Sequence, residues 1–190
     1  MMIDRSLSLV IPLERDAGDL LYVHSTPISS QVYDSYWRVL ARTFSDINMQ
    51  GLGAMGPRIA AKMLRDVAEE MGVWSDDPRA KRIGVERGLI AEIRRLTNAL
   101  VPGEKGWELI PIDDAVKSGH VDEEDLEEVD GILVFFTAGS HLFRKATRTE
   151  LLTGALAPWG ARIESLSCTE FLKSLTTSTA GESTGVSAVA

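Results

Sequence analysis

Short apolar runs open the chain, and apolar positions at helical spacing follow them. Residues 6–12 and 20–25 are apolar and contain β-branched or aromatic side chains, and residues 14–19 between them include Gly18. This pattern predicts a β-hairpin with a loop longer than a two-residue turn. Because two strands alone are marginally stable in water, the hairpin must pack on helices or pair with a further strand, from this chain or from a second copy.

Two amphipathic helices are predicted after the hairpin. The first covers residues 30–47, with Ser29 or Ser30 as a suitable N-cap residue. The second covers residues 57–71 and starts with a proline, which is favoured in the first turn of a helix. Gly72 follows its last apolar position and is typical of a residue just beyond a helix C-terminus.

The most regular helical pattern covers residues 84–101. Its apolar positions lie within about 80° of arc on a helix, a narrow seam of the kind that helices use to pack together: Val85, Leu89, Ile93, Leu96 and Leu100. Pro102 and Gly103 end this pattern, and residues 107–110 could form a short extended piece. We therefore expect a third helix here.

Further helices are predicted in the second half of the chain. Residues 111–119 predict a short helix, and residues 122–146 a long one whose middle is apolar nearly all round, so that it is buried on more than one side. Residues 148–156 predict another helix, and residues 168–175 a last turn or two.

These elements predict a mainly α fold. Residues 1–175 form a single helical domain, with the hairpin at about residues 6–25. In residues 176–190 almost every position is Ser, Thr, Gly or Ala, and Glu182 is the only charge. Such a segment has too little apolar surface to offset its ordering entropy, so we expect a disordered C-terminal tail.

Composition narrows the classes of function. The net charge of −8 over 190 residues argues against nucleic acid as a partner, since phosphate binding needs a concentrated basic surface. Residues 1–7 lack the charged-then-apolar order of a signal peptide, and the longest strongly apolar run, residues 131–136, is too short to span a bilayer. A single cysteine, Cys168, fits a reducing compartment. We expect a cytoplasmic protein that does not enter a membrane.

A glycine motif raises the question of cofactor chemistry. Residues 51–56 read Gly-Leu-Gly-Ala-Met-Gly, which matches the dinucleotide-binding pattern. That motif needs a preceding strand, whereas residues 30–47 have helical periodicity. We interpret it as a helix–helix connection and expect no cofactor. A nucleotide-binding enzyme that uses this loop remains an alternative.

Other reactive residues show no catalytic or metal-binding spacing. His24, His120 and His141 are far apart in the sequence, and Cys168 has no cationic neighbour that would activate it. Seven of the nine residues 122–130 are acidic but lack the spacing of a calcium loop, and acids are favourable at a helix start. We assign no catalytic residue and no metal site.

Three tryptophans are candidates for binding a protein partner. Trp37 lies at the margin of the apolar face of its predicted helix, and Trp74 and Trp159 lie beside predicted helix ends. Aromatic side chains at such positions are enriched in protein interfaces.

The chain resembles the tail assembly chaperones of long-tailed bacteriophages. The likeness lies in the helix at residues 32–47 and in these stretches: residues 11–16 (IPLERD), 21–29 (LYVHSTPIS), 56–61 (GPRIAA), 85–98 (VERGLIAEIRRLTN), and 168–171 (CTEF) with the Ser/Thr-rich tail. The resemblance implies a small, mostly helical protein of the host cytoplasm. It implies binding to tail tube and tape measure proteins during assembly, absence from the finished particle, and no catalytic residues.

Two alternatives to a chaperone stay open at this point. A structural virion component, such as a tail terminator or connector, would gain support if residues 6–25 added strands to a neighbouring copy. A nucleotide-binding enzyme would use the loop at residues 51–56. The sequence leaves the oligomeric state open, including a homo-oligomer, as well as the surface that binds a partner.

Overall fold

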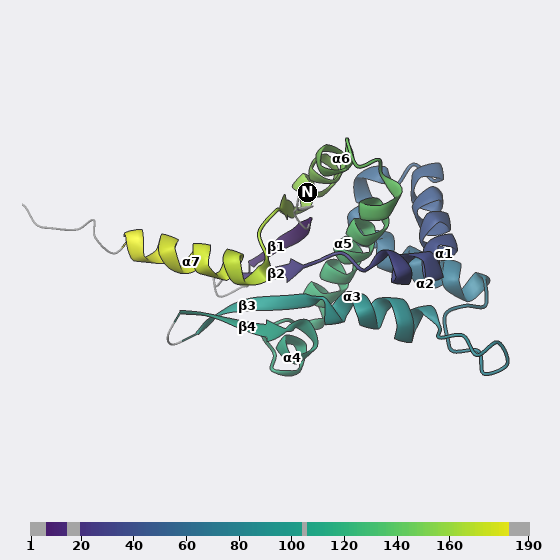
Figure 1. The fold of residues 1–190 in the computed structure, drawn as a ribbon, viewed down its shortest axis with the longest axis horizontal. Coiled ribbons are helices and arrows are strands. Elements are labelled where there is room, and N and C mark those ends of the chain that lie inside the picture. Colours follow the sequence, from purple (N-terminus) through teal and green to yellow (C-terminus); the bar gives the residue numbers. More distant parts are fainter. Residues whose placement is uncertain (1–6, 15–19, 104–105, 183–190) are drawn as a thin grey trace, which may run out of the picture.

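A five-stranded antiparallel sheet forms the centre of the protein (Figure 1). The computed structural model describes residues 7–14, 20–103 and 106–182, with side chains described as far as Leu175. The strands lie in the order β4-β3-β2-β1-β5. Their bounds are β1 (Ser8–Glu14), β2 (Leu20–Ser25), β3 (Thr97–Gly103), β4 (Gly106–Pro111) and β5 (Arg162–Glu164).

The predicted N-terminal hairpin is confirmed, and it lies inside the sheet. β1 and β2 pair from Leu9 opposite Ser25 to Glu14 opposite Leu20. Their outer sides pair with β5 and β3 of the same chain. The loop expected between the strands includes residues 15–19, which lie outside the described residues. The hairpin is therefore part of the core. Within the chain, the outer side of β2 pairs with β3 at Tyr22–Ser25, and the outer side of β1 pairs with β5 at Ser8–Val10.

The expectation of a mainly α fold is wrong, since the protein combines helices with a full sheet. The main error lies in residues 84–101, which divide into a helical half that ends at Arg95 and the strand β3. Both faces of β3 are covered: Ala99 and Val101 face the larger core, and Leu100 faces a second cluster. A strand buried on both sides loses its polar alternation, so its apolar run resembles a buried helix.

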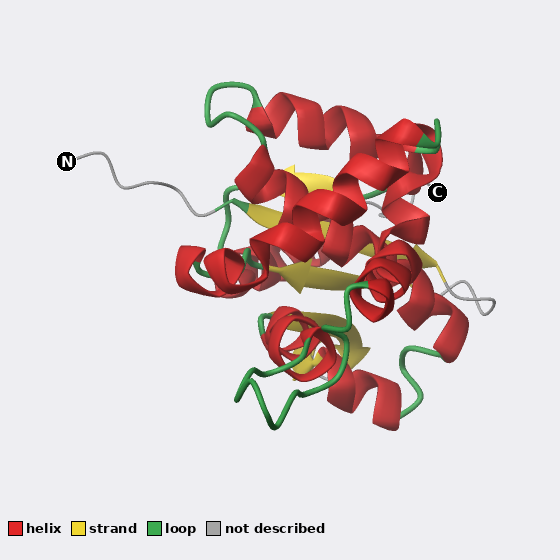
Figure 2. Cartoon of the chain, turned by 90° about the vertical axis from the view of Figure 1, so that its right-hand side faces the viewer, coloured by secondary structure: helices red, strands yellow, loops and turns green. Residues whose placement is uncertain are grey.

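Three long helices cover one face of the sheet, as Figure 2 shows with the strands behind them. They are α1 (Ser30–Met49), α2 (Gly56–Glu70) and α5 (Glu123–Leu142). Ser29 caps α1 by accepting a bond from the Val32 N–H at 3.3 Å, as predicted. Residues 131–140 of α5 are all buried, which confirms that this helix is enclosed on more than one side.

α2 and α5 cross at a glycine. A Cβ atom built on Gly131 would lie 2.4 Å from the carbonyl oxygen of Arg58 and 2.6 Å from that of Pro57. The two backbones can therefore approach this closely only without a side chain at position 131. This crossing fixes α2 against the centre of the molecule.

Shorter helices complete the helical part. A π-helical turn, η2 (Glu86–Ile90), leads into α3 (Ala91–Arg95), and α4 (Ile112–Lys117) and α6 (Arg148–Leu156) confirm two predicted helices. Two 3₁₀ turns, η1 (Gly53–Met55) and η3 (Ala157–Trp159), adjoin α2 and α6.

The last helix lies on the opposite face of the sheet. α7 (Cys168–Glu182) packs Phe171 onto Val10 and Leu100, with the ring of Tyr22 at 5.6 Å from that of Phe171. The disordered tail was expected from residue 176, whereas α7 continues the helix to Glu182. The remaining residues, 183–190, lie outside the described part of the chain.

Candidate functional site

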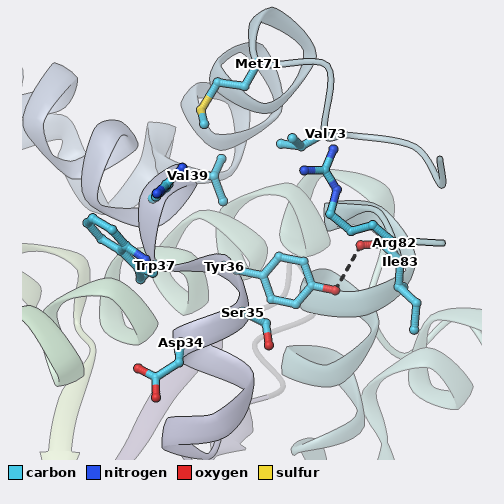
Figure 3. A pocket seen from close by; sticks show the side chains of 10 residues that line it. Asp34, Ser35, Tyr36, Trp37, Val39, Met71, Val73, Arg82 and Ile83 are labelled. Carbon is cyan, nitrogen blue, oxygen red and sulfur yellow. Dashed lines mark hydrogen bonds between the residues drawn. The ribbon is translucent and has the colours of Figure 1, made fainter. Parts of the chain in front are cut away.

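A groove of about 440 Å³ lies between α1 and the segment that follows α2 (Figure 3). The first half of α1 forms one wall and residues 71–83 form the other. Its apolar lining consists of Tyr36, Trp37, Val39, Met71, Val73 and Ile83. Its lining includes Trp37, one of the predicted partner-binding residues.

Exposed apolar side chains surround this groove. The exposed fractions are 50% for Trp37, 41% for Met71 and 60% for Ile83. Figure 3 shows them on separate sides of the groove, Trp37 on α1, Met71 at the end of α2 and Ile83 on the loop. Apolar groups that stay exposed around a hollow are typical of surfaces that bind another molecule.

Tyr36 joins the two walls. Its hydroxyl donates to the carbonyl oxygen of Ile83 at 3.3 Å (Figure 3). Burial, and then the charge of Asp76, raise the pKa of Tyr36, so the phenol keeps the proton that it donates. A Cβ atom on Gly88 would lie 1.7 Å from this hydroxyl, so only glycine leaves room for it.

The loop wall is held by its own hydrogen bonds. Asp76 accepts the Gly84 N–H at 2.8 Å and pairs with Arg87 at 2.5 Å. The Gly84 bond, followed by Arg87, lowers the pKa of Asp76, so this carboxylate stays charged. Asp77 and Arg82 pair through their backbones, with N–O distances of 3.1 and 3.3 Å. Ile83 is therefore presented on a braced turn, and little ordering is needed before a partner binds.

The structure places the three predicted tryptophans in three different surroundings. Trp37 lies at the groove. Trp74 is half-buried, with the Arg65 guanidinium 5.2 Å from its ring, and it lines a second hollow of about 400 Å³. Trp159 packs against the main core, and its indole N–H is buried without a partner in the described structure.

Sequence reasoning missed most of the groove. The sequence pattern gives Met71 only as the last apolar position of the second predicted helix and predicts no element for residues 75–82. One available indication was Ile83 itself, a large apolar residue directly after a polar stretch. The contact between Tyr36 and Ile83 joins residues 47 positions apart, and local periodicity cannot reveal such a contact.

The glycine motif lies between two helices, as predicted. α1 ends at Met49 and α2 begins at Gly56, with the short η1 turn between them. No strand delivers its first glycine, so the local geometry of a dinucleotide-binding turn is missing from residues 51–56.

His24 and His141 make structural contacts within the protein. His24 donates from Nε2 to the Leu166 carbonyl oxygen at 3.1 Å, and burial lowers its pKa. His141 stacks on Tyr33 with ring centres 4.3 Å apart, and its pKa is also lowered by burial. Across residues 7–14, 20–103 and 106–182, no group of three or more His, Cys, Asp or Glu side chains could hold a metal ion. In the same ranges no helix is long and apolar enough to cross a bilayer.

Cys168 is expected to react slowly with alkylating agents. Burial raises the pKa of its thiol to about 11. The thiolate fraction at pH 8 should then be about a hundredfold lower than that of a free cysteine. Mass spectrometry of iodoacetamide labelling between pH 7 and 10 checks this, with glutathione and the denatured protein as references. A folded-state rate equal to that of glutathione at pH 8 would contradict the expected burial.

Comparison of the chain with protein-family models, with curated proteins and with solved structures finds no match.

Proposed function

We propose that the protein is a tail assembly chaperone of a long-tailed bacteriophage. It binds tail tube protein, tape measure protein or both during tail assembly in the host cytoplasm, performs no catalysis, and is absent from the mature particle. The observation that carries this proposal is the groove between α1 and residues 71–83, with exposed apolar side chains on braced walls.

A chaperone of this kind needs a surface that covers apolar groups of an unassembled partner. Trp37, Met71 and Ile83 supply such a surface, and aromatic and Met side chains are enriched in protein interfaces. The Tyr36 bond to Ile83 and the Asp76 bond to Gly84 hold the walls in place. Binding to a preformed groove loses less conformational entropy than binding that must first order a loop.

One alternative loses the observation that would have favoured it. A structural virion component was linked to residues 6–25 pairing with a neighbouring copy. The hairpin instead pairs within the chain on each side, β2 with β3 at Tyr22–Ser25 and β1 with β5 at Ser8–Val10. The groove, which leaves apolar side chains exposed, suits reversible binding of a partner better than the hairpin does.

Co-purification tests the proposal. The tagged protein is expressed with the neighbouring phage genes, and bound proteins and mature particles are analysed by mass spectrometry. We expect tube or tape measure protein to be recovered, and the chain to be missing from particles. Trp37→Ala should lower this recovery about tenfold, since an exposed aromatic at an interface centre often dominates binding.

Leu151→Ala is the matched control for Trp37→Ala. Leu151 is a similarly exposed apolar residue, 48%, but it lies on α6. We expect this variant to recover as much partner as the wild type. Presence of the chain in particles at a fixed copy number would contradict the chaperone proposal and indicate a structural role. If both variants recovered equally little partner protein, the groove would not be the binding site.

A further inference from the structure

The charges beside the groove differ in sign from the charge of the whole chain. The chain has a net charge of −8. Arg38 and Arg82 line the groove, and Arg79 and Lys81 lie on the same turn as Arg82. None of these four cations has an ion-pair partner among the described residues. We call them the basic rim.

Most acidic groups near the rim are already neutralised. Asp76 pairs with Arg87, Glu69 with Arg65 at 2.9 Å, and Glu70 with Arg42 at 3.7 Å. Asp34 also lines the groove, but Figure 3 shows its carboxylate on the far side of Tyr36 from Arg82. Asp77, on the same turn as the rim, has no ion-pair partner among the described residues, and its Oδ1 accepts the Arg79 N–H at 2.9 Å. Four unpaired cations against Asp34 and Asp77 still leave positive charge beside the apolar side chains of the groove.

The walls of the groove favour a helical occupant. One wall is the helix α1, whose backbone groups are bonded within the helix. In the other wall, Asp77 and Arg82 bond to each other through their backbones, and the Gly84 N–H bonds to Asp76. Neither wall offers a strand edge, so a bound segment must satisfy its own backbone hydrogen bonds, which a helix does.

We propose that this groove binds an acidic amphipathic helix of the partner protein. The apolar face of that helix lies between Trp37, Met71 and Ile83, and its flanking carboxylates lie beside Arg38 and Arg82. This inference rests on the proposed chaperone function and adds the chemistry of the partner segment. The rest of the acidic surface repels such a helix, so the basic rim determines where and in which orientation it binds.

A pair of synthetic peptides tests the inference. Both are about 20 residues long, enough to form a helix, with Leu at positions i, i+3, i+4 and i+7. One carries Glu on its flanks and the other Lys, and both are fluorescently labelled. Anisotropy with the purified wild-type protein at low salt should show the Glu peptide binding at least about tenfold more tightly than the Lys peptide. Its affinity should fall as salt is added, because exposed charges are screened.

Charge-reversal variants locate the binding site. Arg38→Glu on α1 and Lys81→Glu on the loop should each weaken the Glu peptide about three- to tenfold, since each exposed charge contributes modestly. Lys173→Glu makes the same change in net charge on α7, on the other face of the sheet, and should leave the affinity unchanged. Circular dichroism of each variant checks that the fold is retained.

Each other outcome contradicts either the inference or the chaperone function on which it rests. Equal or tighter binding of the Lys peptide would exclude an acidic partner segment. If neither peptide binds, analytical sedimentation of the wild type and of Arg38→Glu follows. Self-association that is lost in Arg38→Glu would identify a second copy of this chain as the occupant of the groove. No self-association would mean that the groove has no occupant. If co-purification recovers tube or tape measure protein while the Glu peptide fails, the chaperone function stands and only this inference falls. If the Glu peptide binds but no partner co-purifies, the chaperone function falls instead.

Discussion

Gly131→Ala will lower the free energy of unfolding by about 3 kcal/mol, the cost of overpacking a tight core contact. This is expected although alanine is the better helix former by about 1 kcal/mol. The added Cβ would lie within 3.0 Å of three backbone atoms of Pro57 and Arg58, so α2 and α5 must move apart. Urea denaturation followed by circular dichroism measures the change. A larger side chain at position 131, such as valine, should lower the free energy of unfolding further.

Gly154→Ala is the matched control. Gly154 is also inside a helix, α6, but a Cβ atom there meets nothing within 4 Å. The substitution should therefore raise the free energy of unfolding by up to about 1 kcal/mol through helix propensity alone. If both glycine variants proved equally stable, the close α2–α5 crossing would not exist in solution.

Arg94→Met will lower the free energy of unfolding by about 2 kcal/mol at neutral pH, somewhat less than when one partner of a fully buried ion pair is removed, because the pair is partly buried. Arg94 makes two hydrogen bonds to the carboxylate of Asp130, one of them from Nε at 3.2 Å, and lies 3.7 Å from Asp113. The Asp130 side chain is only 18% exposed. Without the guanidinium, this carboxylate would be left charged in a poorly solvated position.

The effect of Arg94→Met should shrink as the pH falls. Burial raises the pKa of Asp130 in the wild type, and Arg94 opposes that rise. Removal of Arg94 raises the pKa of Asp130 further. For an acid whose folded pKa lies above its unfolded value, protonation favours the folded state, and this contribution is lost as pH rises through the folded pKa. The loss in free energy of unfolding caused by Arg94→Met is thus largest at neutral pH and smaller near the pKa of Asp130.

Arg95→Met provides the comparison for the neighbouring position. Arg95 pairs with Glu92 at 2.6 Å, but its side chain is 66% exposed. Removal of an exposed pair should change the free energy of unfolding by at most about 1 kcal/mol. Denaturation of both variants between pH 4 and 7 tests the contrast. If the loss in free energy of unfolding of Arg94→Met grew toward acid pH, the role assigned to Asp130 would be contradicted.

The sequence was sufficient for elements with clear local patterns. α6 has the predicted bounds, α1 starts at its predicted cap, and Gly72 has the positive φ of +63° expected after a helix. β3 was missed because its two faces are both buried. β5 was not expected because Arg162–Glu164 is a three-residue strand that owes its form to pairing with Leu9 and its neighbours.

The candidate site could be predicted only in part. Trp37 was identified from its position at the margin of an apolar helix face. Its companions Met71 and Ile83 lie far along the chain, and they reach the groove through the turn after α2 and through the Tyr36 bond. These are tertiary contacts, which periodicity and composition do not encode.

The pairing of β1 with β5 has a consequence for how the chain folds during synthesis. Leu9 pairs with Ile163, so one side of β1 waits for a strand that leaves the ribosome more than 150 residues later. Contacts between such distant residues close slowly because of the loop entropy. Until then the nascent chain carries an open strand edge, which can pair with another nascent chain. Synthesis of β5 therefore both completes the sheet and ends a period of vulnerability to aggregation.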